Sequence, residues 1–569
     1  MKLKTLSAAC AMALGGMATQ AQAITPFEAA DVTIMLSGAT APDNFIASIA
    51  IALFEGSEGN NAGWWRFRDD AGTPAVFTDD GRLFNAYFGQ VKNTADIPAT
   101  LRGRKVMFIK RSKGGSVWGV NPVARALPIA TISLVQDPDG PAGAGIGCNL
   151  DTSVTPNRYS CTEIGNDPGL GITVTGQEYI EDFGVSDVAP NLFKAPYNVE
   201  FGFNQLTASE VSNLSVFAVN TLMMGLGTTK LDGNDAPIIP NTTFISRSMY
   251  GSILSGLVQD WTQVDPTLNP PAGTQTLVCR RVPGSGTQTS YNWFFNNFPC
   301  QVNSIAGTGN TVPGRMADSV GYNDGDGDGF PDTCYNTATS TEVDCTGNPN
   351  AGTTNLPYVV DPSAGFTVIE NSTSSNVRDC MAKAARGGAH TFRDERDKAF
   401  RIDFGATGGY GAIAVLSVDS LGQENGWSFR NMDGAGDYIG GVVTGTGVAP
   451  TQPNLIDGKY DYSVELTMQY RSKRVTYCQS ATDANNIFTI APAANCPGGF
   501  IKRDVLPMTD ASNALKRAFA DEFIKRAGSP AFQRPWTASL FPNFTPNGVD
   551  PVAKGTRFGN MCSPLQILF

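Results

Sequence analysis

The chain has 569 residues, of which 41% are hydrophobic and 16% are charged, a composition typical of a folded protein with more than one lobe. Its formal net charge of −11 at pH 7 argues against nucleic acid as a partner, because binding to a phosphate backbone needs a basic face. The single histidine, His390, excludes a histidine-rich zinc cluster and leaves one candidate for histidine-based catalysis.

Residues 1–23 have the features of a secretory signal peptide. Lys2 and Lys4 give it a basic start, an apolar stretch follows from Leu6 to Met17, and small residues precede the expected cleavage site after Ala23. No later segment has 18 consecutive apolar residues, so we expect no membrane span. The mature protein is therefore expected in the periplasm or outside the cell.

Eleven cysteines are present, and Cys10 lies within the predicted signal peptide. The remaining ten allow five disulfides, as expected in an oxidising compartment. Nearness along the chain is the only basis for pairing them. It predicts Cys148 with Cys161, Cys279 with Cys300, Cys334 with Cys345, Cys478 with Cys496, and Cys380 with Cys562.

Three short β-branched strands each lead into a glycine-bearing turn, which is the pattern of α/β units. The strand and turn of these units are residues 32–36 and 37–40, residues 105–109 and 111–115, and residues 276–279 and 284–287. Polar stretches at about 58–104, 136–176 and 302–366 are expected to be surface insertions. Near the end, residues 511–526 carry apolar side chains at helical spacing and predict an amphipathic helix.

The third turn has the residues of an anion site at a helix start. Ser285 suits the N-cap, Gly286 lets a ligand approach the backbone, and Thr287 adds a hydroxyl. Arg281 can bring a positive charge to the same point, and Pro299 ends the helix. The alternative is an ordinary capped helix with Arg281 on the surface.

Four motifs, in their order along the chain, resemble the periplasmic phosphate-binding proteins of ABC importers. They are GAT at Gly38–Thr40, SKGG at Ser112–Gly115, DFGVSDVAP at Asp182–Pro190 and RRVPGSGTQT at Arg280–Thr289. The resemblance implies an α/β fold of the type II periplasmic binding protein (Venus-flytrap) kind, with two lobes and large loop insertions. An anion would lie between the lobes.

The resemblance also implies a division of the chain. Lobe 1 would comprise residues 24–220 and 415–569, the second part including the closing helix. Lobe 2 would comprise residues 221–414, with an insertion at about 302–366.

The resemblance implies a phosphate site made of residues from both lobes. The implied ligands are Thr40, Ala41, Ser112, Asp187, Arg281, Ser285, Gly286 and Thr287. Asp187 would accept the proton of the phosphate, and the others would donate hydrogen bonds or, at Arg281, charge. One position departs from the pattern, because Pro283 stands where the family has an acidic residue that orients the arginine. The expected ligand is therefore phosphate or a similar tetrahedral oxyanion.

The segment from Asp324 to Asp332 resembles the calcium loops of thrombospondin type 3 and dockerin repeats. Its candidate ligands are the carboxylates of Asp324, Asp326, Asp328 and Asp332 and the carbonyl of Phe330. Alternating carboxylates with glycines between them suit a hard cation such as calcium. The alternative is an acidic turn without a metal. A bound calcium would have a structural or adhesive role.

Two further features have structural interpretations. His390 is expected to be a surface or packing residue and not a catalyst. Trp64, Trp65 and Phe67 are expected to pack in the core, the alternative being a carbohydrate platform.

We therefore expect an extracytoplasmic solute-binding protein that delivers its anion to an ABC importer permease. The alternative is a secreted, calcium-stabilised adhesive or matrix protein that retains the binding fold, which the length of 569 residues favours. We expect no enzymatic activity, because neither a metal pair nor a nucleophile with a base is evident.

Overall fold

The computed structural model describes residues 24–569 with internal gaps. The gaps are residues 60–62, 70–82, 139–145, 153–154, 166, 168–178, 201–202, 231–236, 240–244, 301–313, 395, 397, 421–423, 433–436, 440–441, 445–446, 481–486, 490–494, 530–538, 541–554, 565 and 568–569. The predicted signal peptide and its cleavage site lie outside the described residues.

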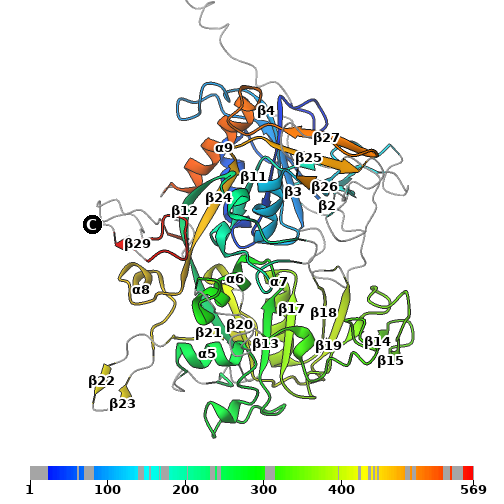
Figure 1. Ribbon diagram of the computed structural model, residues 1–569, viewed down its shortest axis with the longest axis vertical. Coiled ribbons are helices and arrows are strands. Elements are labelled where there is room, and N and C mark those ends of the chain that lie inside the picture. The colour runs from blue at the N-terminus through cyan, green and yellow to red at the C-terminus, as the bar shows by residue number, and fades with distance from the viewer. Residues whose placement is uncertain are drawn as a thin grey trace, which may run out of the picture.

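The chain forms two α/β lobes, one above the other in Figure 1. One 14-stranded sheet runs through both lobes, with β12 (Leu214–Thr229) and β24 (Ser463–Arg471) antiparallel to each other near its middle. The register of this pair shifts between Ala218 and Asn220, which marks a β-bulge at Val219. The predicted two-lobed α/β fold is confirmed.

In the upper lobe (lobe 1) the sheet continues outward from β24. The strands follow in the order β11 (Phe183–Ser186), β1 (Val32–Gly38), β4 (Lys105–Arg111), β3 (Phe84–Gln90), β2 (Trp64–Asp69), β8 (Arg158–Cys161) and β7 (Cys148–Asp151). Strand β1 lies parallel to β4 and β11 and is buried almost throughout, as expected for a strand covered on both faces. Helices α2 (Asp43–Leu53) and α9 (Ala514–Ala527) pack on this part of the sheet, where Phe108 meets Phe519 and Phe523.

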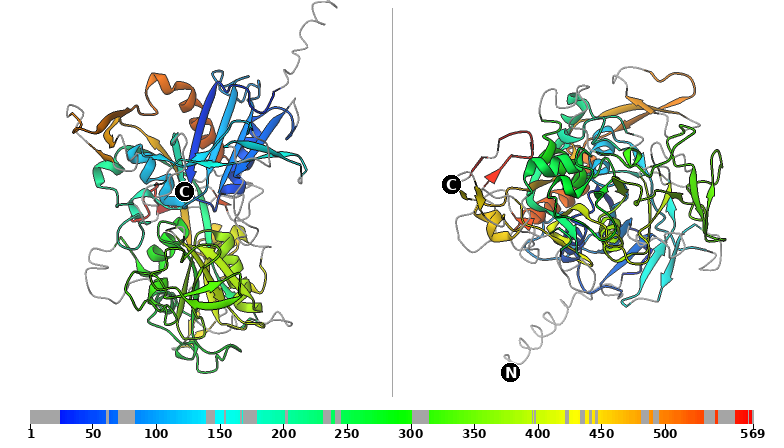
Figure 2. Two further views of the ribbon diagram at one scale, coloured as in Figure 1. Left: turned by 90° about the vertical axis from the view of Figure 1, so that its right-hand side faces the viewer. Right: turned by 90° about the horizontal axis from the view of Figure 1, so that it is seen from below.

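In the lower lobe (lobe 2) the sheet continues from β12 in the other direction. The strands are β20 (Ala412–Ser417), β13 (Leu277–Arg281) and β17 (Thr367–Asn371), with β21 (Trp427–Phe429) and β28 (Ser539–Leu540) also pairing with β12. The helices are α5 (Arg247–Leu254), α6 (Gly286–Asn296) and α7 (Ser374–Arg386). Since β20 and β21 pair with the lobe 2 half of β12, the chain returns to lobe 1 with β24. In Figure 2 the chain passes from the blue upper lobe to the green lower lobe and returns to the upper lobe in orange.

A second sheet of five strands lies in lobe 2. Its order is β15 (Thr341–Asp344), β14 (Thr333–Asn336), β16 (Tyr358–Val359), β19 (Ala399–Asp403) and β18 (Ala389–Arg393). The remaining helices are α3 (Asn121–Arg125), α4 (Ala208–Val211) and α8 (Gln452–Ile456), and the 3-10 turns are η1 (Ser116–Gly119), η2 (Pro190–Leu192), η3 (Trp261–Gln263), η4 (Met316–Asp318), η5 (Val418–Ser420) and η6 (Ala511–Asn513). The remaining strands are β5 (Pro128–Ile129), β6 (Thr131–Ile132), β9 (Glu163–Ile164), β10 (Tyr179–Ile180), β22 (Asp437–Ile439), β23 (Val442–Thr444), β25 (Val475–Ser480), β26 (Ile487–Thr489), β27 (Phe500–Val505), β29 (Gly555–Thr556) and β30 (Gln566–Ile567).

The three predicted strand–turn units are present as β1, β4 and β13, and the predicted closing helix is η6 followed by α9. The polar stretches 58–104 and 136–176 are more than surface insertions, because they contribute β2, β3, β7 and β8 to the main sheet. The aromatic residues Trp64, Trp65 and Phe67 are buried in β2, which confirms their packing role. In the described part of the chain, no helix is both long enough and apolar enough to cross a bilayer.

Ten cysteines form five disulfides, but two of the predicted pairings are wrong. Cys279 pairs with Cys380, and Cys300 pairs with Cys562. Helix α7 packs against β13 and brings Cys380 to Cys279. The pairing is therefore set by packing of the lobe 2 core and not by nearness along the chain. The other three pairs, Cys148–Cys161, Cys334–Cys345 and Cys478–Cys496, are as predicted.

Candidate functional site

The predicted anion-site residues come together where the two lobes meet. Thr40 follows β1, Ser112 follows β4, Asp187 follows β11, and Arg281 ends β13. Strands β1, β4 and β11 are parallel, so their carboxyl ends share one edge of the lobe 1 part of the sheet, and the turn after β13 faces them from lobe 2. The lobes touch here, since the backbone N–H of Val117 in lobe 1 donates to the carbonyl of Gly284 in lobe 2 at 2.9 Å.

Arg281 bridges the lobes with a buried guanidinium. Its Nη1 donates to Thr40 Oγ1 at 3.2 Å and to Ser374 Oγ at 3.3 Å. Its Nη2 donates to the Ser372 carbonyl at 2.5 Å, and its Nε donates to the Asn371 carbonyl at 3.2 Å. Backbone carbonyls thus orient the arginine, a role that the family gives to an acidic residue where this chain has Pro283.

The start of α6 supplies two hydroxyls without partners. Ser285 is the N-cap residue, but its side chain makes no capping hydrogen bond. The Ser285 Oγ and Thr287 Oγ1 atoms are buried and have no hydrogen-bond partner among the described residues. Buried polar groups are normally paired, so these two hydroxyls are available to a ligand.

Gly286 lies between these hydroxyls, directly against lobe 1. A Cβ atom at this position would be 2.3 Å from Ser116 Oγ and 2.6 Å from Asp187 Cβ. Only glycine therefore allows α6 to approach lobe 1 this closely. The helix ends at Asn296 and is followed by Asn297 in the left-handed conformation, just before Pro299, as predicted.

Asp187 is buried, and its Oδ1 has no partner among the described residues. Burial raises the pKa of Asp187 to about 6, and the charge of Arg281 opposes that rise. Its backbone N–H donates to Ser116 Oγ at 3.2 Å, which fixes the turn. The carboxyl group is therefore an acceptor placed beside Arg281 and the start of α6.

Lys110 and Asp43 support the turns of lobe 1, and sequence analysis did not identify either. Lys110 Nζ lies 3.2 Å from Asp43 Oδ1 and donates to Ser112 Oγ at 3.0 Å. The Ser112 side chain also hydrogen-bonds to Asp43, and the backbone N–H of Ser112 donates to the Leu83 carbonyl at 2.7 Å, so this turn is held in place. Burial raises the pKa of Asp43, and the charge of Lys110 opposes the rise.

Asp419 in η5 is a second carboxyl group close enough to interact with Asp187. Burial and, to a smaller extent, the charge of Asp187 together raise the pKa of Asp419 to about 7. The Asp419 Oδ1 atom has no partner within the described part of the chain. Sequence analysis did not identify Asp419 as a site residue.

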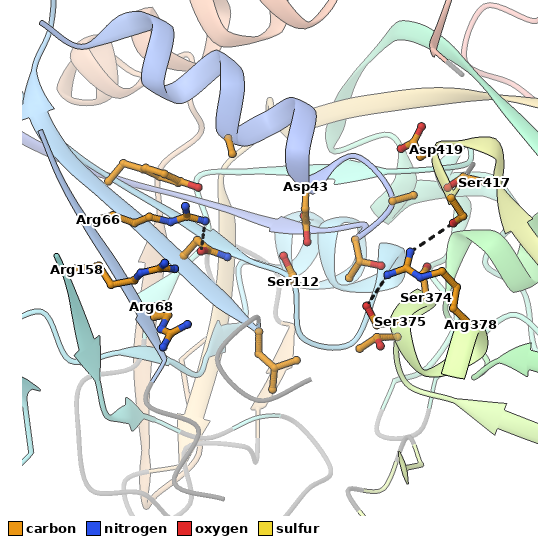
Figure 3. A pocket seen from close by; sticks show the side chains of 18 residues that line it. Asp43, Arg66, Arg68, Ser112, Arg158, Ser374, Ser375, Arg378, Ser417 and Asp419 are labelled. Atoms are coloured by element: carbon orange, nitrogen blue, oxygen red, sulfur yellow. Dashed lines mark hydrogen bonds between the residues drawn. The ribbon is translucent and has the colours of Figure 1, made fainter. Parts of the chain in front are cut away.

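A cavity of about 600 Å³ lies beside these turns. Its lining side chains are drawn in Figure 3. Its lining is Thr40, Ala41, Asp43, Ala47, Arg66, Arg68, Leu83, Asn85, Tyr87, Ser112, Arg158, Thr373, Ser374, Ser375, Arg378, Ser417, Asp419 and Ser420. The cavity thus includes three of the predicted ligands and extends well beyond them. The other predicted ligands are buried and do not line the cavity. They are Asp187, Arg281 and residues 285–287.

His390 is fully buried and does not line this cavity. Its Nδ1 lies 2.7 Å from Asp379 Oδ2, and its Nε2 lies 2.8 Å from Asn371 Oδ1. It therefore has the predicted packing role. His390 also holds Asn371 in place, and the backbone carbonyl of Asn371 accepts a hydrogen bond from Arg281.

The acidic loop brings three of its four carboxylates together. One side-chain oxygen from each of Asp324, Asp326 and Asp332 lies within 4.8 Å of the others. Asp328 is not in this group, and its Oδ1 accepts from the backbone N–H of Phe330 at 2.8 Å. The Phe330 ring stacks on Tyr358 and anchors the loop to the five-stranded sheet. The donor set of carboxylates fits a hard cation.

No protein-family model matches the chain, and no curated protein matches it. Among solved structures, a putative phosphate ABC transporter substrate-binding protein with bound phosphate from Clostridium perfringens is 10% identical, with a TM-score of 0.30 over 78% of this chain and 87% of that chain. A phosphate binding protein from Stenotrophomonas maltophilia is 11% identical, with a TM-score of 0.27 over 77% and 79%. An ABC-type phosphate transport receptor from Vibrio cholerae is 13% identical, with a TM-score of 0.22 over 51% and 68%. Identities and TM-scores are low, so the function of this chain rests on the geometry of its own site.

Proposed function

We propose that this protein is an extracytoplasmic solute-binding protein that holds phosphate, or a similar tetrahedral oxyanion, between its two lobes. The observation that carries the proposal is the pair of buried, unpartnered hydroxyls of Ser285 and Thr287 beside Arg281. Hydroxyl donors, a guanidinium and the start of an 11-residue helix on one side of a site favour an anion.

Each lobe supplies donors to the anion in this proposal. Lobe 1 contributes the Thr40 and Ser112 hydroxyls and the Thr40 and Ala41 backbone amides. Lobe 2 contributes Arg281 and the first turn of α6. Contact between the lobes excludes water, which strengthens each of these interactions.

Asp187 gives the site its selectivity for a protonated anion. Phosphate near neutral pH keeps a proton that it can donate to the Asp187 carboxylate, whereas sulfate has none. Sulfate would therefore place two unpaired acceptors together in a buried site. A site that pairs with a ligand hydroxyl can reject an analogue without it by roughly 10⁴–10⁵-fold.

The proposed location is the periplasm or the exterior, with delivery of the anion to an ABC importer permease. Five disulfides are compatible with an oxidising compartment. The similar proteins from Vibrio cholerae and Clostridium perfringens are described as phosphate receptors of ABC transporters. We propose binding without catalysis.

Retention of radiolabelled phosphate by purified protein, followed by calorimetric titration, tests this function. Wild type is expected to bind phosphate and to bind sulfate far more weakly. The Arg281→Ala substitution should weaken the binding of both phosphate and sulfate. The Asp187→Asn substitution should instead narrow the preference for phosphate over sulfate, because the amide can donate a hydrogen bond to sulfate. No phosphate binding by wild type would contradict the proposal and favour the alternative of a calcium-stabilised adhesive protein.

We propose a structural calcium site in the loop from Asp324 to Asp332. The convergence of three carboxylates supports it, because they repel one another unless a cation lies between them. The disulfide Cys334–Cys345 closes the segment just after the loop. Calcium and disulfide together would hold this part of lobe 2.

A further inference from the structure

We propose that the ligand is larger than inorganic phosphate: a phosphorylated compound whose second anionic group is bound by Arg66, Arg68 and Arg158. This inference rests on the proposed function, because the phosphoryl group of the compound would occupy the anion site described above. It assigns a role to the part of the cavity that the anion site leaves unused.

The cavity is too large for phosphate alone. Its volume of about 600 Å³ lies within the range of roughly 300–1,000 Å³ that holds drug-sized ligands. Thr40, Ala41 and Ser112 line it, so the cavity reaches the lobe 1 turns of the anion site. A phosphate with four oxygens would leave most of this volume empty.

Three arginines form one end of the cavity in lobe 1 (Figure 3). Arg66 and Arg68 alternate along β2 and therefore project from the same face of the sheet. Arg158 stands on the neighbouring strand β8. The arrangement concentrates three guanidinium groups on one wall.

The hydrogen bonds of these arginines leave donors for a ligand. Arg66 Nη2 donates to Asn85 Oδ1 at 3.1 Å, and Arg68 Nη2 forms an ion pair with Asp151 at 3.1 Å. The Nε atoms of all three arginines are buried and have no partner among the described residues. Buried guanidinium donors without acceptors are costly, so a bound anion would stabilise this wall.

The local charge balance also favours an anion. Among the described residues, Glu58 and Asp151 are the acidic groups that interact with these three arginines, which leaves one positive charge in excess within that set. Burial and the neighbouring charges of Arg68 and Arg66 lower the pKa of Arg158. A ligand anion between the arginines would relieve that repulsion.

The register of the sheet gives the length of the ligand. Arg68 pairs with Asn85, and Asn85 pairs with Lys110, whose side chain contacts Ser112 of the anion site. Two strand spacings therefore separate Arg68 from Lys110, which lies beside the anion site. This corresponds to about 10 Å between their Cα atoms. Arg158 lies one strand further. The two anionic groups of the ligand would need a spacer between them.

The side of the cavity opposite the arginines comes from lobe 2 and is polar (Figure 3). Ser375, Ser417 and Ser420 present hydroxyls from lobe 2, and Asp419 offers a carboxyl group. Arg378 stands beside them and donates to Ser375 Oγ at 2.9 Å. Hydroxyl groups on the spacer could exchange hydrogen bonds with these side chains.

Calorimetric titration of wild type with inorganic phosphate, hexyl phosphate, 6-phosphohexanoate and 1,6-hexanediol bisphosphate tests the inference. The two compounds with a second anionic group are expected to bind at least about tenfold more tightly than hexyl phosphate, as expected for hydrogen bonds to charged groups. In Arg158→Gln and in Arg66→Gln this advantage should disappear while the affinity for inorganic phosphate stays unchanged. The control is Arg104→Ala, which removes an exposed arginine of the same lobe outside the cavity. Its affinities for all four compounds should equal those of wild type.

The outcomes separate this inference from the proposed function. If inorganic phosphate binds but a second anionic group brings no advantage, the inference is overturned and the phosphate-binding function stands. If the advantage survives in both arginine variants, these arginines do not bind the second group and the inference is overturned as well. If no phosphoryl compound binds, the proposed function fails and the inference fails with it.

Discussion

Replacement of Gly286 by alanine is expected to weaken ligand binding without unfolding either lobe. The added Cβ would lie 2.3 Å from Ser116 Oγ and 2.6 Å from Asp187 Cβ, whereas ordinary contacts of a Cβ are 3.4–4 Å. Gly286 belongs to lobe 2 and its two neighbours belong to lobe 1, so the clash arises only when the lobes are in contact. Overpacking of this kind costs about 1–3 kcal/mol. If this cost is subtracted from the binding free energy, the Kd for the ligand rises about 5- to 150-fold.

The stability of the ligand-free protein should move little, because alanine favours a helix over glycine by up to about 1 kcal/mol and the lobes can separate to relieve the clash. Titration calorimetry with phosphate measures the Kd, and thermal unfolding without ligand measures the stability. Gly498→Ala is the matched control, since a Cβ at that position has no atom within 4 Å. Wild-type affinity in Gly286→Ala would refute the close approach of the lobes at this residue.

Three further outcomes are expected. Because burial raises the pKa of Asp187 to about 6, its carboxyl group is charged above that pH and protonated below it, so competition by sulfate for labelled phosphate should strengthen as the pH falls from 7.5 to 5. A preference for phosphate over sulfate that stays constant over this pH range would contradict the role of Asp187. Calcium at 100 times its dissociation constant stabilises by about 2.7 kcal/mol, so a chelator should lower the Tm of wild type but not that of Asp326→Asn; equal Tm shifts in both would exclude the site. Peptide mapping without reduction should recover Cys300 linked to Cys562, and a link from Cys300 to Cys279 would contradict the structure.

The sequence is most informative where the chemistry is local. The turns at Thr40, Ser112 and Ser285 could be predicted because a strand, a glycine and a hydroxyl residue follow one another directly, and the structure brings these three turns to one place. Nothing local shows that Arg281 is oriented by the carbonyls of Asn371 and Ser372, because β17 is placed beside β13 only by the sheet.

The arginine wall could not be assembled from the sequence for the same reason. Arg158 reaches Arg66 through pairing of β8 with β2, two strands that lie about ninety residues apart in stretches predicted to be surface insertions. One local signal was present. The alternation of Arg66 and Arg68 with Trp65 and Phe67 has the two-residue period of a half-buried strand, and it would have placed both arginines on one face.

The bulge at Val219 has a consequence for motion between the lobes. Because β12 and β24 belong to one continuous sheet, the lobes cannot shift independently as domains on a flexible linker would. Separation of the lobes would bend or twist this pair of strands, and a bulge is where a ladder lacks regular hydrogen bonds and bends most readily. The hinge is thus built into the backbone of the sheet, and the amplitude of opening is set by the stiffness of two strands and not by the length of a connecting loop.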